Sequence, residues 1–174
     1  MKRSIGIFQL WGFAFTSLAG TLLHFLYDFA NKAIWAAPFS AVNESTWEHM
    51  KLLFFPALLY AIFESFFFCD RADFFCIKLR GILLGLILIP VLFYTYNGAI
   101  GKSPDWINIT IFFVSAAIAY IFETRLFASG RAECRSKNRA IALLVILALL
   151  FVIFTFQTPT IGIFKDPISG GYGI

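Results

Sequence analysis

The side chains best suited to chemistry are two histidines and three carboxylates near the ends of two apolar segments. His24 and Asp28 lie four residues apart at the end of one segment, and Glu44, Glu48 and His49 lie at the start of the next. The chain contains no other histidine. Imidazoles and carboxylates together are typical ligands of Zn²⁺ and related divalent ions. We therefore interpret His24, Asp28 and His49 as metal ligands, with Glu48 or Glu44 as a general base acting on metal-bound water.

Composition places these groups in a membrane protein. Hydrophobic residues make up 60% of the chain, 23 of its 174 residues are Phe, and the mean hydropathy is +0.81. A soluble domain is only ~45–50% apolar, even on a count that includes glycine. A membrane span needs roughly 20 apolar residues. The sequence predicts an all-α transmembrane bundle, one domain of residues 1–174, with five spans at 5–30, 47–68, 77–100, 106–128 and 140–157.

Lysine and arginine set the expected orientation, because basic residues resist translocation. With the N-terminus in the cytoplasm, Lys32, Lys51, Lys102 and Lys165 lie outside, and the other ten of the 14 basic residues lie inside. This split predicts a multi-pass protein of the cytoplasmic membrane, with the N-terminus inside and the C-terminus outside. The net charge of +4 therefore reflects topology, and no nucleic-acid partner is expected.

The predicted cytoplasmic side has polar groups of its own. Cys69, Cys76 and Cys134 are expected to be reduced thiols there, and three is an odd number for a disulfide framework. Glu64 and Glu123 are expected to form ordinary interfacial pairs with nearby Lys and Arg.

Helical phase predicts that the two histidines meet. At about 100° per residue, Gly20, His24 and Asp28 share one narrow face of the first span, which is small and polar and so favours contact with protein. His49 lies on a similar face of the second span, where Pro56 frees a backbone carbonyl and opens space. We therefore expect both rings to enter one site in the outer leaflet.

Several of these residues also have structural interpretations. Ser45 and Glu48 fit a capping box, in which Glu48 reaches back to the backbone amide of the cap residue. Glu44 and Glu48 also suit the positive end of a helix dipole. Lys51 would snorkel to the interface or pair with Glu48. These interpretations stay open beside the catalytic one.

The C-terminal residues 159–174 contain Asp-Pro and several glycines, which favour turns over a helix. Their apolar members predict that this tail docks over the polar site as a partial lid. The expected substrate or lid residues are Asn43, Lys51, Asn97, Asp166 and Tyr172.

Residues 24–28, 41–56 and 166–173 together resemble a family of small bacterial membrane proteins, frequent in Gram-positive anaerobes, that carries only a domain-of-unknown-function label. The core of the resemblance is Asn-Glu-Ser-x-Trp-Glu-His-x-Lys at residues 43–51. The resemblance extends over the whole chain. It implies a bacterial cytoplasmic membrane protein and supplies no activity.

Three functions fit these residues. The first is a metal-dependent, zinc-type membrane hydrolase that acts on a lipid or another amphiphile. The second is a small proton-coupled transporter with His49, Tyr60 and Glu64 as a relay along one helix. The third is a non-enzymatic partner or sensor subunit. The sequence names no substrate and no oligomeric state.

Overall fold

The computed structural model describes residues 2–68, 70–101, 104–130 and 132–174. The predictions for Cys69 and Lys102 lie outside these residues. The fold is an all-α bundle, as predicted, and the described residues form no strand apart from one isolated bridge between Lys165 and Tyr172. The elements are α1 (Lys2–Phe29), α2 (Thr46–Ser65), α3 (Phe74–Ile100), α4 (Asp105–Ser129), α5 (Lys137–Phe156) and the short 3₁₀ helix η1 (Gly162–Phe164).

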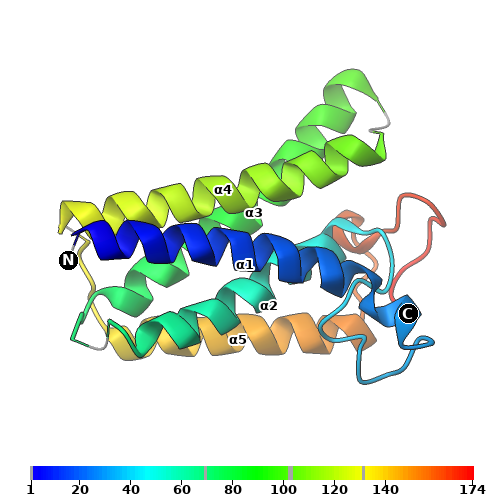
Figure 1. Ribbon diagram of the computed structural model, residues 1–174. Helices are drawn as coiled ribbons and strands as arrows, with labels where there is room; N and C mark the ends of the chain where they lie inside the picture. Colours follow the sequence, from blue (N-terminus) through cyan, green and yellow to red (C-terminus); the bar gives the residue numbers. More distant parts are fainter. Residues whose placement is uncertain (1, 69, 102–103, 131) are drawn as a thin grey trace.

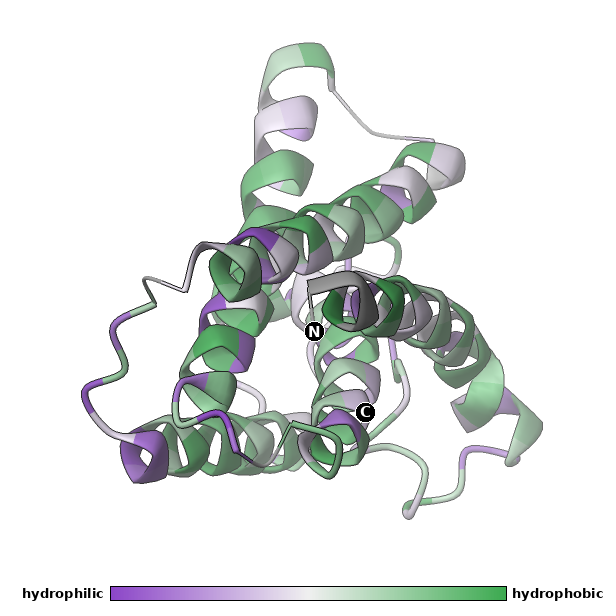
Figure 2. Cartoon of the chain, turned by 60° about the vertical axis from the view of Figure 1, so that its left-hand side comes forward, coloured by the Kyte–Doolittle hydropathy of each residue, from purple (hydrophilic) through white to green (hydrophobic). Residues whose placement is uncertain are grey.

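Four of the five α-helices are long and apolar enough to cross a membrane. These candidate spans are Ile5–Phe29, Phe74–Ile100, Trp106–Ser129 and Lys137–Phe156. The remaining helix, α2, has 20 residues and a length of about 30 Å, but it carries the charged residues Glu48, Lys51 and Glu64. Hydrophobic residues dominate the ribbon in Figure 2. The chain termini lie at opposite ends of the bundle (Figure 1), here called the N-terminal end and the C-terminal end.

Three helices begin three residues earlier than hydropathy predicts. Helix α1 starts at Lys2 instead of 5, α3 at Phe74 instead of 77, and α5 at Lys137 instead of 140. At α5 the hydroxyl of Ser136 accepts a hydrogen bond from the backbone N–H of Arg139 at 3.4 Å, so a polar first turn is capped. Hydropathy marks the apolar part of a helix and misses such a turn.

Close contact between α1 and α2 depends on Gly20. A Cβ atom at this position would lie 2.6 Å from the carbonyl oxygen of Leu52 and 2.6 Å from the ring of Phe112. The Leu52 carbonyl is the one that Pro56 deprives of its helical hydrogen bond. The small face of α1 therefore contacts protein, as predicted, and brings the turn that carries His24 against the first turns of α2.

The main hydrophobic core is centred on α2. Leu53 and Phe54 are almost completely buried, and they belong to one cluster with Ile82 of α3, Phe112 of α4 and Phe151 of α5. Helix α2 thus packs inside the bundle, which explains how it accommodates charged residues that would be costly next to lipid.

Three charged residues expected at the interface are buried inside the bundle instead. Glu64, Lys78 and Glu123 are 0%, 0% and 2% exposed. They come from α2, α3 and α4, and Gly81 leaves the space that the Glu123 side chain occupies. The prediction of interfacial pairing was wrong, because sequence proximity to Arg and Lys did not reveal which charged groups the helices bring together.

The cysteines also differ from expectation. Cys76, in the first turn of α3, forms a disulfide with Cys134 in the connector between α4 and α5, with a Cα–Cα distance of 5.6 Å. The sequence spacing of 58 residues gave no signal for this pair, which the fold brings together at the N-terminal end.

Candidate metal site at the C-terminal end

The connector between α1 and α2 folds back over the end of α1. Asn31 and Lys32 have positive φ values of 51° and 58°, which turn the chain directly after the helix. The hydroxyl of Ser40 then accepts a hydrogen bond from the backbone N–H of Tyr27 and donates one to the carbonyl of Leu23. These bonds hold the connector against α1, so its last residues lie beside His24.

Side chains of the connector also fix the start of α2. The hydroxyl of Ser45 accepts from the backbone N–H of Glu48 at 3.4 Å, and Asn43 Oδ1 accepts from the N–H of Ser45 at 2.9 Å. The Glu48 carboxylate accepts from the N–H of Val42 at 2.9 Å. The predicted cap at Ser45 is confirmed, although Glu48 bonds an amide three residues before the cap residue. Glu44 therefore lies between Asn43 and Ser45, and both of these residues are held by side-chain hydrogen bonds.

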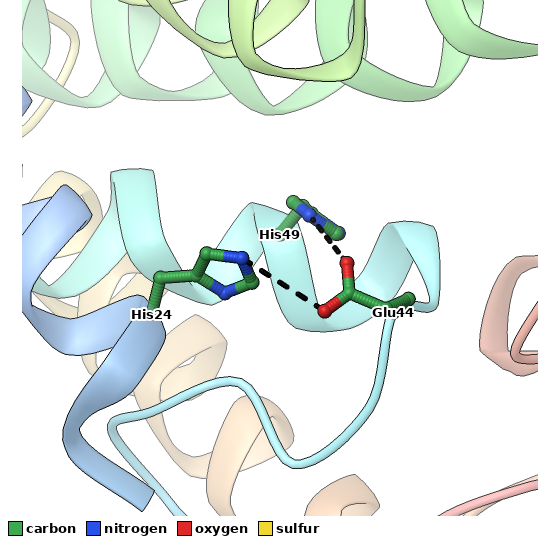
Figure 3. A group of neighbouring side chains, drawn as sticks. All are labelled: His24, Glu44 and His49. Carbon is green, nitrogen blue, oxygen red and sulfur yellow. Dashed lines mark ion pairs between the residues drawn. The ribbon is translucent and has the colours of Figure 1, made fainter. Parts of the chain in front are cut away.

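This arrangement aims Glu44 at both histidines. Its Oε1 lies 3.8 Å from Nε2 of His24, and its Oε2 lies 3.5 Å from Nε2 of His49. The two imidazole centroids are 5.5 Å apart, so the prediction that the rings approach each other is confirmed. Figure 3 shows the Glu44 carboxylate beside the two rings, with one of its oxygens directed at each ring. One ligand atom from each residue lies within 4.8 Å of the other two.

These separations suit one divalent ion. Ligand atoms at 2.0–2.1 Å from a tetrahedral Zn²⁺ are about 3.3–3.4 Å apart. The observed separations of 3.5 Å and 3.8 Å are to different oxygens of Glu44, and one ligand atom from each residue lies within 4.8 Å of the other two. The side chains must therefore move closer together to reach that geometry. Two histidines and one glutamate also form a known catalytic ligand set, in which a fourth position is left for water.

The hydrogen bond of His49 defines its protonation. Nδ1 lies 3.0 Å from the carbonyl oxygen of Ser45, and a carbonyl can only accept, so Nδ1 carries the proton. In the neutral ring Nε2 then presents a lone pair to the Glu44 carboxylate. Two acceptors facing each other repel, so a proton on either group or a cation at the site would stabilise this geometry. A hydrogen bond from the other ring nitrogen to a backbone carbonyl, as His49 makes to Ser45, is typical of metal-bound histidine.

The other predicted ligand and the other predicted base lie elsewhere. Asp28 is exposed and is not part of the group formed by His24, Glu44 and His49. Glu48 is 3% exposed and forms an ion pair with Lys51, with 2.6 Å between Oε2 and Nζ. Helical spacing puts Asp28 on the correct face of α1, but the connector supplies a nearer carboxylate.

Lys51 faces the protein interior. Its Nζ donates to the carbonyl of Ala37 and to the hydroxyl of Thr155, both at 2.9 Å, and the side chain is completely buried. The predicted pairing with Glu48 is confirmed, and snorkelling to the interface was wrong. Glu48 and Lys51 thus tie the connector, α2 and α5 together, and neither lines the cavity at the histidines.

The C-terminal tail docks against the same connector. The Asp166 carboxylate accepts a hydrogen bond from the backbone N–H of Glu44, and Asn43 Nδ2 donates to the carbonyl of Gly173 at 2.9 Å. The Phe164 ring packs on Trp47 with a centroid distance of 4.6 Å. The prediction that the tail docks and brings Asp166 near Glu44 is therefore confirmed.

Asp166 also organises the tail itself. Burial alone would raise the pKa of its carboxyl group, but hydrogen bonds from Ser169, from the backbone of Ile168 and from the backbone of Glu44 lower the pKa below its usual value. The carboxylate is therefore ionised at neutral pH, and it holds the tail against Glu44.

Asn97 and Tyr172 have other partners. Asn97 donates to the carbonyl of Phe93 in its own helix at 2.8 Å. Tyr172 forms the isolated bridge with Lys165 and is 39% exposed. Neither lines the cavity at the histidines. A different amide, that of Asn108 in α4, lines that cavity. The sequence does not predict this position, because no sequence pattern indicates that the start of the fourth span lies near the start of the second span.

A cavity of about 340 Å³ adjoins the candidate metal site. Its polar lining consists of Thr21, His24, Glu44, His49 and Asn108. The rest is apolar, and Phe25 of α1, Ile109 and Phe113 of α4 are exposed on the outer surface of the bundle. The cavity therefore joins a polar end to an apolar opening between α1 and α4, and Ile168 of the tail lines it as well.

Four helices of the described chain that are long and apolar enough to cross a bilayer define its class as a helical membrane protein. Residues 3–174 match a family of unknown function, DUF6512, and the chain belongs to this family. The family resemblance expected from the sequence is thus confirmed. No curated protein and no solved structure matches the chain.

Proposed function

We propose that this protein is a metal-dependent membrane hydrolase of the zinc type, in which His24, Glu44 and His49 bind one divalent ion. The observation that carries the proposal is the pair of imidazole nitrogens facing one carboxylate at 3.5 Å and 3.8 Å. A cation between them satisfies all three groups at once. The bound ion would lower the pKa of its water to ~7 and so supply a nucleophile at neutral pH.

The cavity supports an amphiphilic substrate, such as a lipid. Its polar end would hold the hydrolysable group beside the metal ligands, with the amide of Asn108 on the same wall. Its apolar walls, formed by Phe25, Ile109 and Phe113, would contact an acyl chain that enters the site laterally from the membrane. A cavity of 340 Å³ lies within the usual range for small-molecule sites, ~300–1,000 Å³.

The roles of the carboxylates follow from their contacts. Glu44 is proposed as a metal ligand, because its two oxygens face the two histidines. Glu48 is engaged by Lys51 and by the backbone of Val42, so it is not available as the general base. In the proposed site the metal-bound water needs no separate carboxylate base, since its proton is already labile near pH 7.

The proposal includes a topology of five spans in a bacterial cytoplasmic membrane, with the N-terminus inside and the histidine site at the outer face. The basic residues favour this orientation. The Cys76–Cys134 pair at the N-terminal end favours the opposite one, because disulfides persist in oxidising compartments. We give precedence to the ten-to-four charge split and propose that the Cys76–Cys134 disulfide of the structure is reduced to two adjacent thiols in the cell.

Elemental analysis of the purified protein tests the metal site. We expect close to one divalent ion per chain in the unmodified protein and loss of that ion in His24→Ala, His49→Ala and Glu44→Gln. Asp28→Asn is the matched control, because Asp28 is exposed and outside the group. Retention of metal by the three ligand variants, or its loss in the control, would contradict the ligand assignment.

Hydrolysis is tested separately. The metal-loaded protein in mixed micelles should cleave a long-chain chromogenic ester or phosphoester, and His49→Ala should not. Stoichiometric metal without turnover of either class would leave the binding site in place and reject the hydrolase in favour of a metal sensor or partner subunit.

A further inference from the structure

A second group of charged residues lies inside the bundle near the N-terminal end. The ammonium group of Lys78 is 2.5 Å from Oε2 of Glu123 and 3.0 Å from Oε2 of Glu64. These three residues, here called the triad, come from α3, α4 and α2 and are 0–2% exposed. Neither histidine belongs to the triad.

The groups that face the triad include no second cation among the described residues. From α1, Gln9 Nε2 donates to Oε1 of Glu64 at 2.5 Å, while Gln9 Oε1 is buried without a hydrogen-bond partner in the described part of the chain. The rings of Tyr60 and Tyr120 lie 5.9 Å and 5.0 Å from the Lys78 nitrogen. Both tyrosines are neutral at physiological pH.

Charge counting then identifies an imbalance. One ammonium and two carboxylates carry a net charge of −1 when all are ionised. The other buried ion pair, Glu48 with Lys51, is balanced one to one. An uncompensated charge in the interior of a membrane protein is expensive, and two carboxylates that share one site do not both remain ionised without sufficient compensation.

We propose that the triad is a proton-binding site, in which Glu64 and Glu123 share one exchangeable proton while Lys78 stays charged. The ammonium already fills the space between the carboxylates, so a metal cation would have to displace it. The amide of Gln9, once turned over, offers its free oxygen to a protonated Glu64, because amide oxygen and nitrogen occupy interchangeable positions.

This site is distinct from the candidate metal site. Gln9 and His24 are separated by 15 residues of the same helix, or about 22 Å at 1.5 Å per residue. The triad instead joins α2, α3 and α4, so release of its proton would leave a net negative charge where these three helices meet. The chain therefore contains a protonation site whose state bears on helix packing and which does not depend on the proposed hydrolase.

Infrared difference spectroscopy of the full-length protein in nanodiscs counts protonated carboxyl groups through their carbonyl stretch and its shift in D₂O. At neutral pH the triad should contribute one such group in the unmodified protein, none in Glu64→Gln or Glu123→Gln, and two in Lys78→Met. In the single Gln variants one carboxylate balances one ammonium, so both should also retain or gain thermal stability. If Lys78→Met does not fold, the two Gln variants still decide the matter.

Glu48→Gln is the matched control. It breaks a balanced pair, so we expect a lowered unfolding temperature with the triad's carboxyl signal unchanged. No protonated carboxyl in the unmodified protein at neutral pH would overturn the proposal. The proposal would also be overturned if the carboxyl signal persisted in both Gln variants or disappeared in Glu48→Gln. The same conclusion would follow if the signal were absent and the thermal stability depended on sodium.

Discussion

Replacing Gly20 with alanine tests whether the contact between α1 and α2 builds the histidine site. The new Cβ would lie 2.6 Å from the Leu52 carbonyl oxygen and 2.6 Å from the Phe112 ring. Carbon and carbonyl oxygen usually approach to about 3.3–3.6 Å, so the helices must separate by about 0.7–1.0 Å. Overpacking of this kind costs about 1–3 kcal/mol. Because His24 is one turn away, the same movement should separate its ring from His49.

If that strain is fully relieved by opening the site, metal affinity should fall about 5- to 150-fold. The assays are thermal unfolding in detergent and competition with a chromophoric chelator for Zn²⁺ or Co²⁺. Gly6→Ala is the control on the same helix, since a Cβ there meets nothing within 4 Å. Equal unfolding temperatures for the two variants, together with unchanged affinity in Gly20→Ala, would refute the packing argument.

Three further predictions follow from the same contacts. Metal affinity should fall in acid, since histidine ligands must be neutral to bind a metal ion. Tail docking should persist at pH 5, because the lowered pKa of Asp166 keeps its carboxylate ionised until the pH falls through that lower value. Both are measurable by chelator competition and by protease protection of the tail, and docking lost together with the metal would contradict them. Deleting residues 161–174 removes two hydrogen bonds between the tail and the connector, one from Asn43 and one to Asp166. At about 1 kcal/mol for each bond, the deletion should weaken metal binding by about tenfold or more while the bundle stays folded. Unchanged metal affinity would leave the tail without a role at the site. With the N-terminus inside, Cys76 and Cys134 in intact cells should react with membrane-permeant maleimide and resist an impermeant one, whereas a disulfide isolated under alkylating conditions would reverse the proposed topology.

The positions of the helices along the chain were predictable, because the sequence pattern that indicates a helix is local. Runs of about 20 apolar residues identify helices without knowledge of their neighbours, and the helices start or end within a few residues of expectation. The errors at Lys2 and Lys137 arose where a polar first turn continues a helix past the apolar run. Such turns depend on caps, as at Ser136, that hydropathy does not measure.

The candidate site was predictable in part. Helical periodicity and the position of each histidine along its span were enough to predict that His24 and His49 lie together. The two residues lie on the inward faces of two consecutive helices. They were not enough to choose between Asp28 and Glu44, because that choice depends on how the connector folds. Ser40 binds the connector to the end of α1, and this tertiary contact directs Glu44 to the histidines.

The sequence by itself determined that the chain forms a bundle of apolar helices with its two histidines at one end, because helix period and bilayer thickness act on each segment separately. Only the tertiary structure decided which charged groups share an interior. Lys78 lies between Glu64 and Glu123 because three helices cross at one level, where Gly81 leaves room for a side chain. A helical face is defined by its own residues, but its partners are defined by the packing of the others.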